Sequence, residues 1–443
     1  MHWMSPKERR KLGQAQRKLA GRHAHQELEP KQRPVAALEL IEHSMRGRVP
    51  ALIRLKYEMM AESPFAYFRG AVPVMAADLA ALPRTQIATQ ICGDAHVRNL
   101  GAYAAPDGRL LFDINDFDET VAGPFEWDLK RMAASLVLAG RAAGHKESAC
   151  SGAVEACVAS YSALMHTLAE MPFIEVARFQ VHRMDLARPV HDAFLKAERA
   201  TPRHTLEQLT QPAAGKARRF KEEKPMLTRV TGARAAAVLR GLKPYRDLLQ
   251  PERRQLLSLY RPLDVAFKVV GTGSVGLRDY CVYLEGNGAG DPLFLQIKEE
   301  VASVYAPYLQ SSGAGNRQSR PVTTHNGQRV AEGQRAMQMQ SDPFLGWTQF
   351  AGRQYLVRQL NDHKGSIEID ALDGDNLKAY AEVCGELLAR GHARSGDALV
   401  IAGYLGSGGS FAEALSKFAV RYADQTEKDW EELKRSGKAK GAK

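Results

Sequence analysis

The residues whose types and spacing could carry out chemistry begin with two polar stretches between residues 92 and 119. Asp94 and Asn99 are five positions apart, and Asp116 and Asp118 follow about twenty residues later. A carboxylate such as that of Asp94 can orient an attacking hydroxyl or accept its proton. Mg²⁺ prefers hard oxygen ligands and usually takes only one or two protein carboxylates beside phosphate oxygens. We therefore predict Asp94 as the catalytic base, Asn99 and Asp116 as metal ligands, and Asp118 as a reserve ligand.

A simpler interpretation is that the Gly-Asp and Asn-Asp pairs of these stretches only mark turns. Chemistry is favoured because both motifs occur together and each lies at the end of a predicted strand, residues 86–94 and 109–116. The role of His96 stays open between shaping the loop from below and binding a metal. Glu126 and Asp128 open the next predicted helix, where carboxylates suit the helix dipole. We expect these two to be structural.

A second group of residues could hold phosphates. Gly271, Gly273, Ser274 and Gly276 join two strand-like stretches, and Lys298 ends a third. Glycines allow backbone N–H groups to approach phosphates closely, and a lysine adds a point charge. In a dinucleotide-binding fold such glycines lead from a strand into a helix. Strands on both sides and a lysine on the next strand are instead the layout of a kinase-type phosphate loop, and a glycine-rich hairpin with a snorkelling surface lysine is the alternative.

A kinase-type site also needs a carboxylate that holds the lysine. Glu332, on the next predicted helix, is our first choice for the partner of Lys298, because Glu299 and Glu300 follow the lysine too closely to curl back. Residues 355–360 would then form the strand that enters the hinge beside an adenine. The three residues after it that could touch ribose or substrate, or form a solvated turn, are Asp362, His363 and Lys364.

These residues must be positioned by an α+β fold with a mostly helical large lobe and a small antiparallel-sheet lobe. The sequence changes from helical to strand-like spacing near residue 263 and returns to helical spacing near residue 367. The predicted parts are a basic N-terminal arm (1–34), a helical lobe carrying the first motifs (35–262), the β lobe (263–366), a helical segment completing the large lobe (367–435) and a basic tail (436–443). Residues 201–224 and 311–328 are polar and are predicted to be linkers.

Composition limits the classes of protein. The chain has 443 residues, 44% hydrophobic and 25% charged, which is typical of a globular protein of more than one core. No apolar run is long enough for a membrane span and the first residues lack the apolar segment of a secretory signal, so we expect a cytoplasmic protein. Five scattered cysteines fit reduced thiols. The net charge of +11 favours an anionic small substrate or a solvated basic surface over nucleic acid, for which no recognition motif is present.

Several stretches resemble the bacterial family called domain of unknown function 2252. They are residues 67–70 (Tyr-Phe-Arg-Gly), 93–96 (Gly-Asp-Ala-His), 113–119 (Asp-Ile-Asn-Asp-Phe-Asp-Glu), 124–131 (Pro-Phe-Glu-Trp-Asp-Leu-Lys-Arg), 271–276 (Gly-Thr-Gly-Ser-Val-Gly) and 295–299 (Leu-Gln-Ile-Lys-Glu). The likeness extends over roughly residues 35–430. Separately, residues 93–99 are similar to the catalytic loop of aminoglycoside phosphotransferases, which implies a two-lobed kinase-like fold.

The order of the motifs departs from that of ordinary kinases. There the glycine loop and lysine precede the catalytic loop, whereas here the catalytic loop comes about 180 residues earlier. Circular permutation explains this order, and residues 378–395 resemble the helix that leads into a kinase catalytic loop. Cys92 is a second departure, since kinases usually carry His or Tyr at that position.

Together the motifs predict an ATP- and Mg²⁺-dependent phosphotransferase that acts on a hydroxyl of an unidentified acceptor, more probably a small molecule than a protein. A nucleotidyl transferase that moves AMP would use the same parts with the nucleotide reversed. An inert nucleotide-binding module is a further alternative, although base and metal positions are all present. A metal hydrolase built on Asp94, His96 and Asp116 would not need the segment that ends at Lys298.

Overall fold

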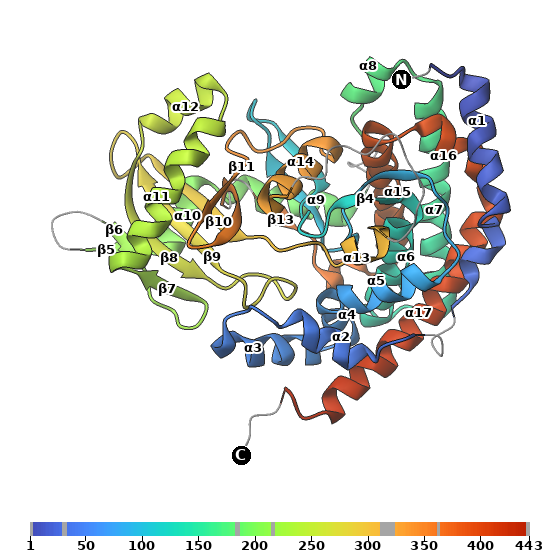
Figure 1. Ribbon diagram of the computed structural model, residues 1–443, viewed down its shortest axis with the longest axis horizontal. Coiled ribbons are helices and arrows are strands. Elements are labelled where there is room, and N and C mark those ends of the chain that lie inside the picture. Colours follow the sequence, from blue (N-terminus) through green and yellow to red (C-terminus); the bar gives the residue numbers. More distant parts are fainter. Residues whose placement is uncertain are drawn as a thin grey trace.

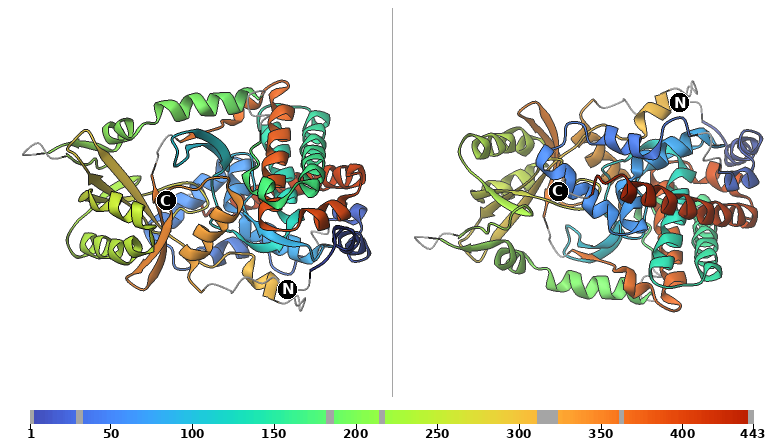
Figure 2. Two further views of the ribbon diagram at one scale, coloured as in Figure 1. Left: turned by 90° about the horizontal axis from the view of Figure 1, so that it is seen from above. Right: turned by 90° about the horizontal axis from the view of Figure 1, so that it is seen from below.

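The computed structural model describes residues 3–28, 33–181, 187–213, 218–310, 324–360 and 364–439. Within them the chain has an α+β fold with antiparallel sheets, as predicted. Figure 1 shows a sheet covered by α11 and α12 on one side of the molecule and a helical part containing α6, α7, α15 and α17 on the other. The same division is visible from above and below in Figure 2.

The described α-helices are α1 (Pro6–Ala15), α2 (Ala37–Ser44), α3 (Pro50–Ala61), α4 (Pro64–Gly70), α5 (Val72–Ala81), α6 (Phe125–Ala142), α7 (Glu147–Glu170), α8 (Phe173–Arg178), α9 (Arg188–Arg199), α10 (Pro202–Leu209), α11 (Gly232–Leu248), α12 (Pro251–Ser258), α13 (Ala306–Gln310), α14 (Asn326–Met337), α15 (Asn376–Ser395), α16 (Ala398–Leu405) and α17 (Gly409–Arg435). The strands are β1 (Ala88–Ile91), β2 (Leu100–Ala104), β3 (Leu110–Ile114), β4 (Val121–Pro124), β5 (Thr210–Pro212), β6 (Arg218–Phe220), β7 (Leu227–Val230), β8 (Arg261–Lys268), β9 (Asp279–Glu285), β10 (Pro292–Glu299), β11 (Gly346–Phe350), β12 (Arg353–Gln359) and β13 (Gly365–Ser366).

The largest sheet has six strands in the order β11-β12-β10-β9-β8-β7, and all neighbours are antiparallel. Its central strands are apolar on both faces because both are covered. Successive side chains of a strand point to opposite faces, so Tyr280 and Val282 join the cluster beneath α11, while Cys281 and Tyr283 pack on the side of α10. The sheet therefore holds Lys298, near the end of β10, in a rigid and buried frame.

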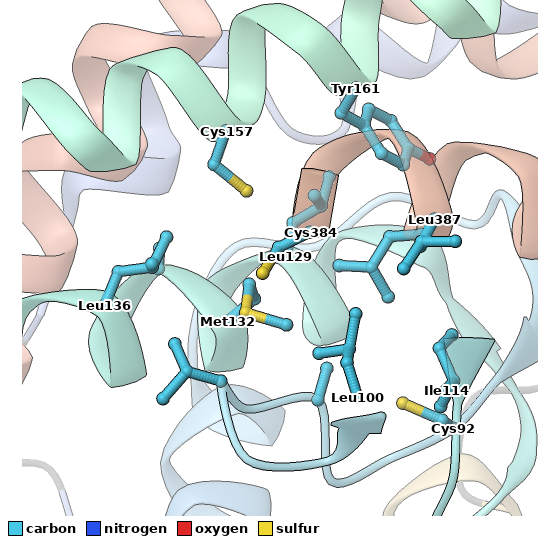
Figure 3. Packing of buried hydrophobic residues seen from close by; sticks show 14 of the residues in the cluster. Cys92, Leu100, Ile114, Leu129, Met132, Leu136, Cys157, Tyr161, Cys384 and Leu387 are labelled. Carbon is cyan, nitrogen blue, oxygen red and sulfur yellow. The ribbon is translucent and has the colours of Figure 1, made fainter. Parts of the chain in front are cut away.

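The helical part is organised around α6, whose residues 125–140 are all buried. Figure 3 shows its side chains Leu129 and Met132 packed with Cys384 of α15 and with Leu100, at the start of β2. Four charged residues of α6 (Glu126, Asp128, Lys130 and Arg131) are buried with them. A buried charge is costly unless it is paired or hydrogen-bonded, so we ask which groups these residues contact.

Two smaller sheets frame those loops. β1 pairs with β4, and β2 lies between β13 and β3, in each case antiparallel. One loop, residues 92–99, leads from β1 to β2 and is called the Asp94 loop below. The other, residues 115–120, leads from β3 to β4 and is called the acidic loop. Both loops therefore emerge from the paired strands at the same place in the fold.

Some predicted boundaries differ from the structure. Residues 201–224, predicted as a linker, contain α10, β5 and β6, while residues 214–217 lie outside the described part. Strand β7 and helix α11 belong to the six-stranded sheet and its cover, although both precede residue 263. Polar composition and short length concealed these elements, because their stability comes from packing against the sheet. Of the second predicted linker, residues 311–323 lie outside the described residues.

The basic N-terminal arm is docked along its described length. The Arg9 guanidinium forms an ion pair of 2.7 Å with Asp397, and Arg17 Nε donates a 2.9 Å hydrogen bond to the carbonyl of Tyr404, so both residues tie the arm to α16. Among the described helices, none alone combines the length and apolar content needed to cross a membrane. Only α16 and α17, bent by 83° at their junction, meet that test when taken together.

Candidate active site

The structure brings the two predicted groups of residues into direct contact. Lys298 Nζ, on β10, lies 2.5 Å from Asp118 Oδ2 and 3.8 Å from Asp116 Oδ1, both on the acidic loop. Lys298 is 4% exposed at its side chain, while the carboxylates of Asp116 and Asp118 are 38% and 23% exposed. The lysine thus reaches out of the sheet to carboxylates that solvent or a ligand can approach from the other side.

Charge at this contact is unevenly balanced. Burial would lower the pKa of Lys298, but the carboxylates of Asp116 and Asp118 raise it, so the ammonium form is secure. Burial and the neighbouring Asp116 carboxylate raise the pKa of Asp118 to about 7. Glu300, the residue after the end of β10, is also buried, and burial and Asp118 raise its pKa well above the usual value. Lys298 is not the only cation acting on these carboxylates, because Arg358 acts to lower the pKa of Asp116 and Arg329 that of Glu300.

Glu332 does not hold Lys298, in contrast to the sequence prediction. Its Oε1 accepts a 2.8 Å hydrogen bond from Gln328 on the same helix, and no ion pair links it to Lys298 among the described residues. The lysine is held by Asp118 instead. Glu300 directly follows the last residue of β10, and with Asp116 and Asp118 it acts to raise the pKa of Lys298.

Asp94 is held by Arg131, from the second turn of α6. Arg131 Nε lies 2.5 Å from Asp94 Oδ1, and its Nη2 donates a 3.0 Å hydrogen bond to the carbonyl of Phe68. Arg131 forms no ion pair with Glu126 or Asp128 among the described residues. Residues 128 and 131, three positions apart on α6, both face the Asp94 loop, whereas Glu126 accepts hydrogen bonds from the backbone N–H and hydroxyl of Thr85. Burial raises the pKa of Asp94, while Arg131 acts in the opposite sense.

Asp128 fixes the backbone on which Asp94 is mounted. Its carboxylate accepts hydrogen bonds from the N–H groups of Cys92, at 2.8 Å, and Gly93, at 2.9 Å. His392 of α15 lies 3.3 Å away on the other side of the same carboxylate. Gly93 has a φ of 80°, and a Cβ there would lie 2.4 Å from the carbonyl oxygen of Glu119. Only glycine therefore allows the Asp94 loop to approach the acidic loop so closely.

Asn99 is oriented in a way that leaves its amide oxygen available. Its Nδ2 donates a 2.7 Å hydrogen bond to the carbonyl of Asp94, which turns Oδ1 away from that carbonyl. Its backbone carbonyl accepts a 2.8 Å hydrogen bond from the N–H of Asn115, the residue before Asp116. The Asp94 loop and the acidic loop are thereby joined directly beside the predicted metal ligands.

His96 is buried at 2% exposure behind the Asp94 loop. Its Nδ1 accepts the N–H of Arg98 at 3.2 Å, and Phe65 of α4 packs against the ring edge with centroids 6.0 Å apart. Burial and the nearby Arg69 and Arg131 guanidinium groups lower its pKa well below the usual value. These contacts give His96 a structural place in the loop, one of the two roles left open from the sequence.

Residues 271–276 form a turn between β8 and β9 and are called the glycine loop below. The loop is fastened from an unexpected direction, by helices near the N-terminus. Lys56 Nζ donates a 2.6 Å hydrogen bond to the carbonyl of Gly273, and Arg48 Nη1 donates one of 2.6 Å to that of Val275. Gly276 has a φ of 90°, and its carbonyl accepts the N–H of Val49 at 2.7 Å. Ser274 Oγ lies 3.3 Å from the carbonyl of Gly271, so its hydroxyl stays within the turn.

A small, partly open pocket of about 40 Å³ lies where the sheet meets the smaller strands. It is lined by Arg358 and Gln359 at the end of β12, by Asn115 before Asp116, and by Gln334 of α14 and Tyr103 of β2. Lys364 also lines it, and the Arg358 guanidinium and burial lower the pKa of Lys364 to about 7. Asp362 and His363, named as possible ribose or substrate contacts, lie outside the described residues.

The donor set suits a hard divalent cation. Among the described residues, no group of three or more His, Cys, Asp or Glu side chains could form a complete metal cage. A Mg²⁺ ion beside phosphates needs fewer protein ligands, since phosphate and water oxygens complete its octahedron. Asn99 Oδ1, to which no described residue donates a hydrogen bond, and the partly exposed carboxylate of Asp116 meet that requirement. The residues therefore fit Mg²⁺.

Sequence reasoning missed several of these residues. Lys56 and Arg69 come from helices before the first motif, and Asp128 was interpreted only as a helix-end residue. Two signals in the sequence pointed to them. Four charged residues occur between positions 126 and 131 of an otherwise apolar predicted helix, and Arg69 belongs to the motif of residues 67–70, to which no role had been assigned. Charged residues in an otherwise apolar helix need partners, and here Asp128 and Arg131 find theirs on the Asp94 loop.

The fold and site define an α+β protein in which a lysine from an antiparallel sheet meets the acidic loop, which is hydrogen-bonded to the Asp94 loop. The chain belongs to the family described as an uncharacterized protein conserved in bacteria, domain of unknown function 2252, whose model matches residues 48–436. No curated protein and no solved structure matches the chain.

Proposed function

We propose that this protein is an ATP- and Mg²⁺-dependent phosphotransferase that phosphorylates a hydroxyl of a small-molecule acceptor. The observation that carries the proposal is the contact of Lys298 with Asp116 and Asp118. It joins Lys298 to the acidic loop, and a hydrogen bond from the N–H of Asn115 to the carbonyl of Asn99 joins the acidic loop to the loop that carries Asp94. Phosphoryl transfer depends mainly on positioning and charge neutralisation, so these few groups are sufficient in kind.

Each residue has a role that its surroundings support. Lys298 would contact the phosphates of ATP beneath the glycine loop, with Asp118 taking the lysine-holding role that we had predicted for Glu332. Asp94, fixed by Arg131, would orient the acceptor hydroxyl. Mg²⁺, held by Asn99 and Asp116 with Asp118 in reserve, would supply charge neutralisation at the phosphate oxygens.

The transfer itself requires little movement of protein groups. The acceptor oxygen forms a bond to the terminal phosphorus of ATP, and the bond from that phosphorus to the bridging oxygen breaks. ADP leaves with the electron pair of that bond, and the hydroxyl proton passes to Asp94. Burial raises the pKa of Asp94, which makes the carboxylate a stronger base than an exposed one.

We also propose that the fold is a circularly permuted, two-lobed kinase-like one. In support, the end of α15 lies beside β1, the strand that enters the Asp94 loop: Thr89 Oγ1 lies 3.1 Å from the carbonyl of His392, 303 positions away. This is the neighbourhood expected if α15 preceded the Asp94 loop in an unpermuted chain. Permutation is tolerated where the joins lie at the surface.

The nucleotide base would lie near the end of β12, where the chain leaves the sheet toward β13. The pocket lined by Gln359, Arg358 and Lys364 lies at that point. It adjoins Asn115, so a nucleotide that widened the pocket would extend its phosphates toward Asp116 and Lys298. A volume of about 40 Å³ is well below that of ordinary ligand pockets, so binding of the base would require the lining side chains to move.

The test is transfer of label from ATP carrying distinguishable isotopes at the α- and γ-phosphates. The protein is incubated with Mg²⁺ and a panel of hydroxyl compounds, including sugars, aminoglycosides and amino alcohols. Transfer of the γ-label alone is the expected result. Transfer of the α-label would replace the proposal by nucleotidyl transfer. Binding of ATP without transfer to any compound of the panel would favour an inert module.

A further inference from the structure

Arg69 is a charged residue of the site that the roles above leave unused. It ends the helix α4, and its side chain is half-buried, with the Nε atom fully buried and without a hydrogen-bond partner. Within the described residues its guanidinium forms no ion pair either, although carboxylates are close by. A guanidinium has five N–H donors in a planar fork and is rarely left unsatisfied when buried. The Arg69 guanidinium therefore has N–H donors available to a bound anion.

The position of α4 shows where that anion would lie. On one side, α4 packs on the Asp94 loop: Phe65 contacts His96, and the ring of Phe68 lies 4.1 Å from the guanidinium carbon of Arg131. On the other side, α4 touches the glycine loop. A Cβ at Gly271 would lie 3.6 Å from Arg69 Nη2, and one at Gly273 would lie 3.8 Å from the carbonyl of Arg69.

Charge around Arg69 supports the same location. Burial and Arg98 lower its pKa, whereas the carboxylates of Asp94 and Asp116 act in the opposite sense. The guanidinium therefore lies in the electric field of the predicted base and of a predicted metal ligand without pairing with either. A group that approaches both the glycine loop and Asp94 in phosphoryl transfer is the terminal phosphoryl group.

We infer that Arg69 binds the terminal phosphate of the nucleotide, between the glycine loop and Asp94. This inference rests on the proposed function and deepens it, because it assigns a residue that distinguishes a triphosphate from a diphosphate. Arginine suits the role, since its fork matches two phosphate oxygens and its charge persists at all working pH values. The same contact would stabilise the group in flight, as charge on its oxygens rearranges during transfer.

The experiment compares the affinities of a non-hydrolysable ATP analogue and of ADP, each with Mg²⁺, by calorimetry. We expect Arg69→Ala to weaken the binding of the ATP analogue by about 10- to 100-fold and the binding of ADP by less than about threefold. This difference corresponds to the loss of a charge-assisted bidentate contact. Arg69→Lys should lose part of the same preference. Arg203→Ala is the matched control, because Arg203 lies on α10 with its side chain 81% exposed, and it should leave both affinities as in wild type.

The outcomes separate this inference from the proposal beneath it. If wild type binds both ligands and Arg69→Ala weakens the binding of the ATP analogue and of ADP equally, the role of Arg69 is overturned and the proposed function still stands. Binding of neither ligand to wild type would overturn the proposed function together with this assignment. If the melting temperature without ligand shows that Arg69→Ala is unfolded, Arg69→Lys and Arg69→Gln replace it in the comparison of the two affinities.

Discussion

Lys298 Nζ lies 2.5 Å from Asp118 Oδ2, which joins a central strand of the large sheet to the acidic loop of the helical part. The two residues are about 180 positions apart in the sequence. Among the described residues, the only other ion pair of either side chain is the one between Lys298 and Asp116, at 3.8 Å. Each therefore depends on the other for burial, and the pair links the two parts of the fold at the candidate site.

The dependence of the pair can be measured by a double-mutant cycle. Lys298→Met leaves buried carboxylates without their cation and should lower the free energy of unfolding by about 3–5 kcal/mol. The double variant Lys298→Met/Asp118→Asn should lose less than the sum of the single variants, by about 1–3 kcal/mol, when measured by urea unfolding. Strict additivity would show that the two side chains do not interact.

Asp128 should be essential to the shape of the Asp94 loop. Asp128→Ala leaves the buried N–H groups of Cys92 and Gly93 without an acceptor, each of which costs about 1–3 kcal/mol. We expect a loss of about 2–4 kcal/mol in urea unfolding. Asp107→Ala, in the exposed turn before β3, serves as the control and should remain close to wild type. A matching stability of Asp128→Ala and wild type would contradict the observed hydrogen bonds.

Asp279 should make stability depend on pH. It lies opposite Lys298 on β9, and burial raises its pKa from 3.8 to about 6. Because the folded state holds this proton more tightly than the unfolded state, stability is greatest below pH 3.8 and is lost as the pH rises toward 6. Asp279→Asn removes this loss, so it should gain up to about 3 kcal/mol over wild type between pH 4 and pH 7. An unchanged difference between variant and wild type across this range would show that Asp279 has an ordinary pKa.

The metal ligands should reveal themselves in the Mg²⁺ dependence of nucleotide binding. In wild type, we expect ATP to bind more tightly with Mg²⁺ than with EDTA. Asn99→Ala and Asp116→Asn should each reduce that gain by about tenfold or more, because the first removes an oxygen ligand and the second replaces a charged oxygen ligand by a neutral one. The affinity measured in EDTA provides the internal control for folding. If both variants keep the full gain in ATP affinity with Mg²⁺, neither Asn99 nor Asp116 is a metal ligand.

Local sequence was sufficient to find the loops of the site. Asp94 and Asp116 each follow a short strand, and the glycine loop joins two strands before Lys298, so strand and turn signals located them. Their meeting could be expected only from the chemistry that they share, since local patterns carry no information about pairs of residues so far apart.

The partners of these residues could not be predicted in the same way. Glu332 does not contact Lys298 as predicted, and the partner of Arg131 was not predicted at all, because such a choice depends on how a helix is rotated against a loop. That rotation is set by packing of the whole helix, such as the fully buried face of α6. Lys56 and Arg69 were missed for a related reason: α3 and α4 precede the first motif, and only tertiary packing brings them onto the glycine loop.

The most direct test of one shared nucleotide site is thermal stabilisation by ATP with Mg²⁺, in wild type and in Lys298→Ala and Asp116→Ala. At a ligand concentration about 100 times Kd, binding should stabilise wild type by about 2.7 kcal/mol and raise its melting temperature. Both variants, though positioned on different parts of the chain, should lose most of that rise. No rise for wild type with either ATP or ADP, or a full rise in both variants, would contradict a site built from Lys298 and the acidic loop.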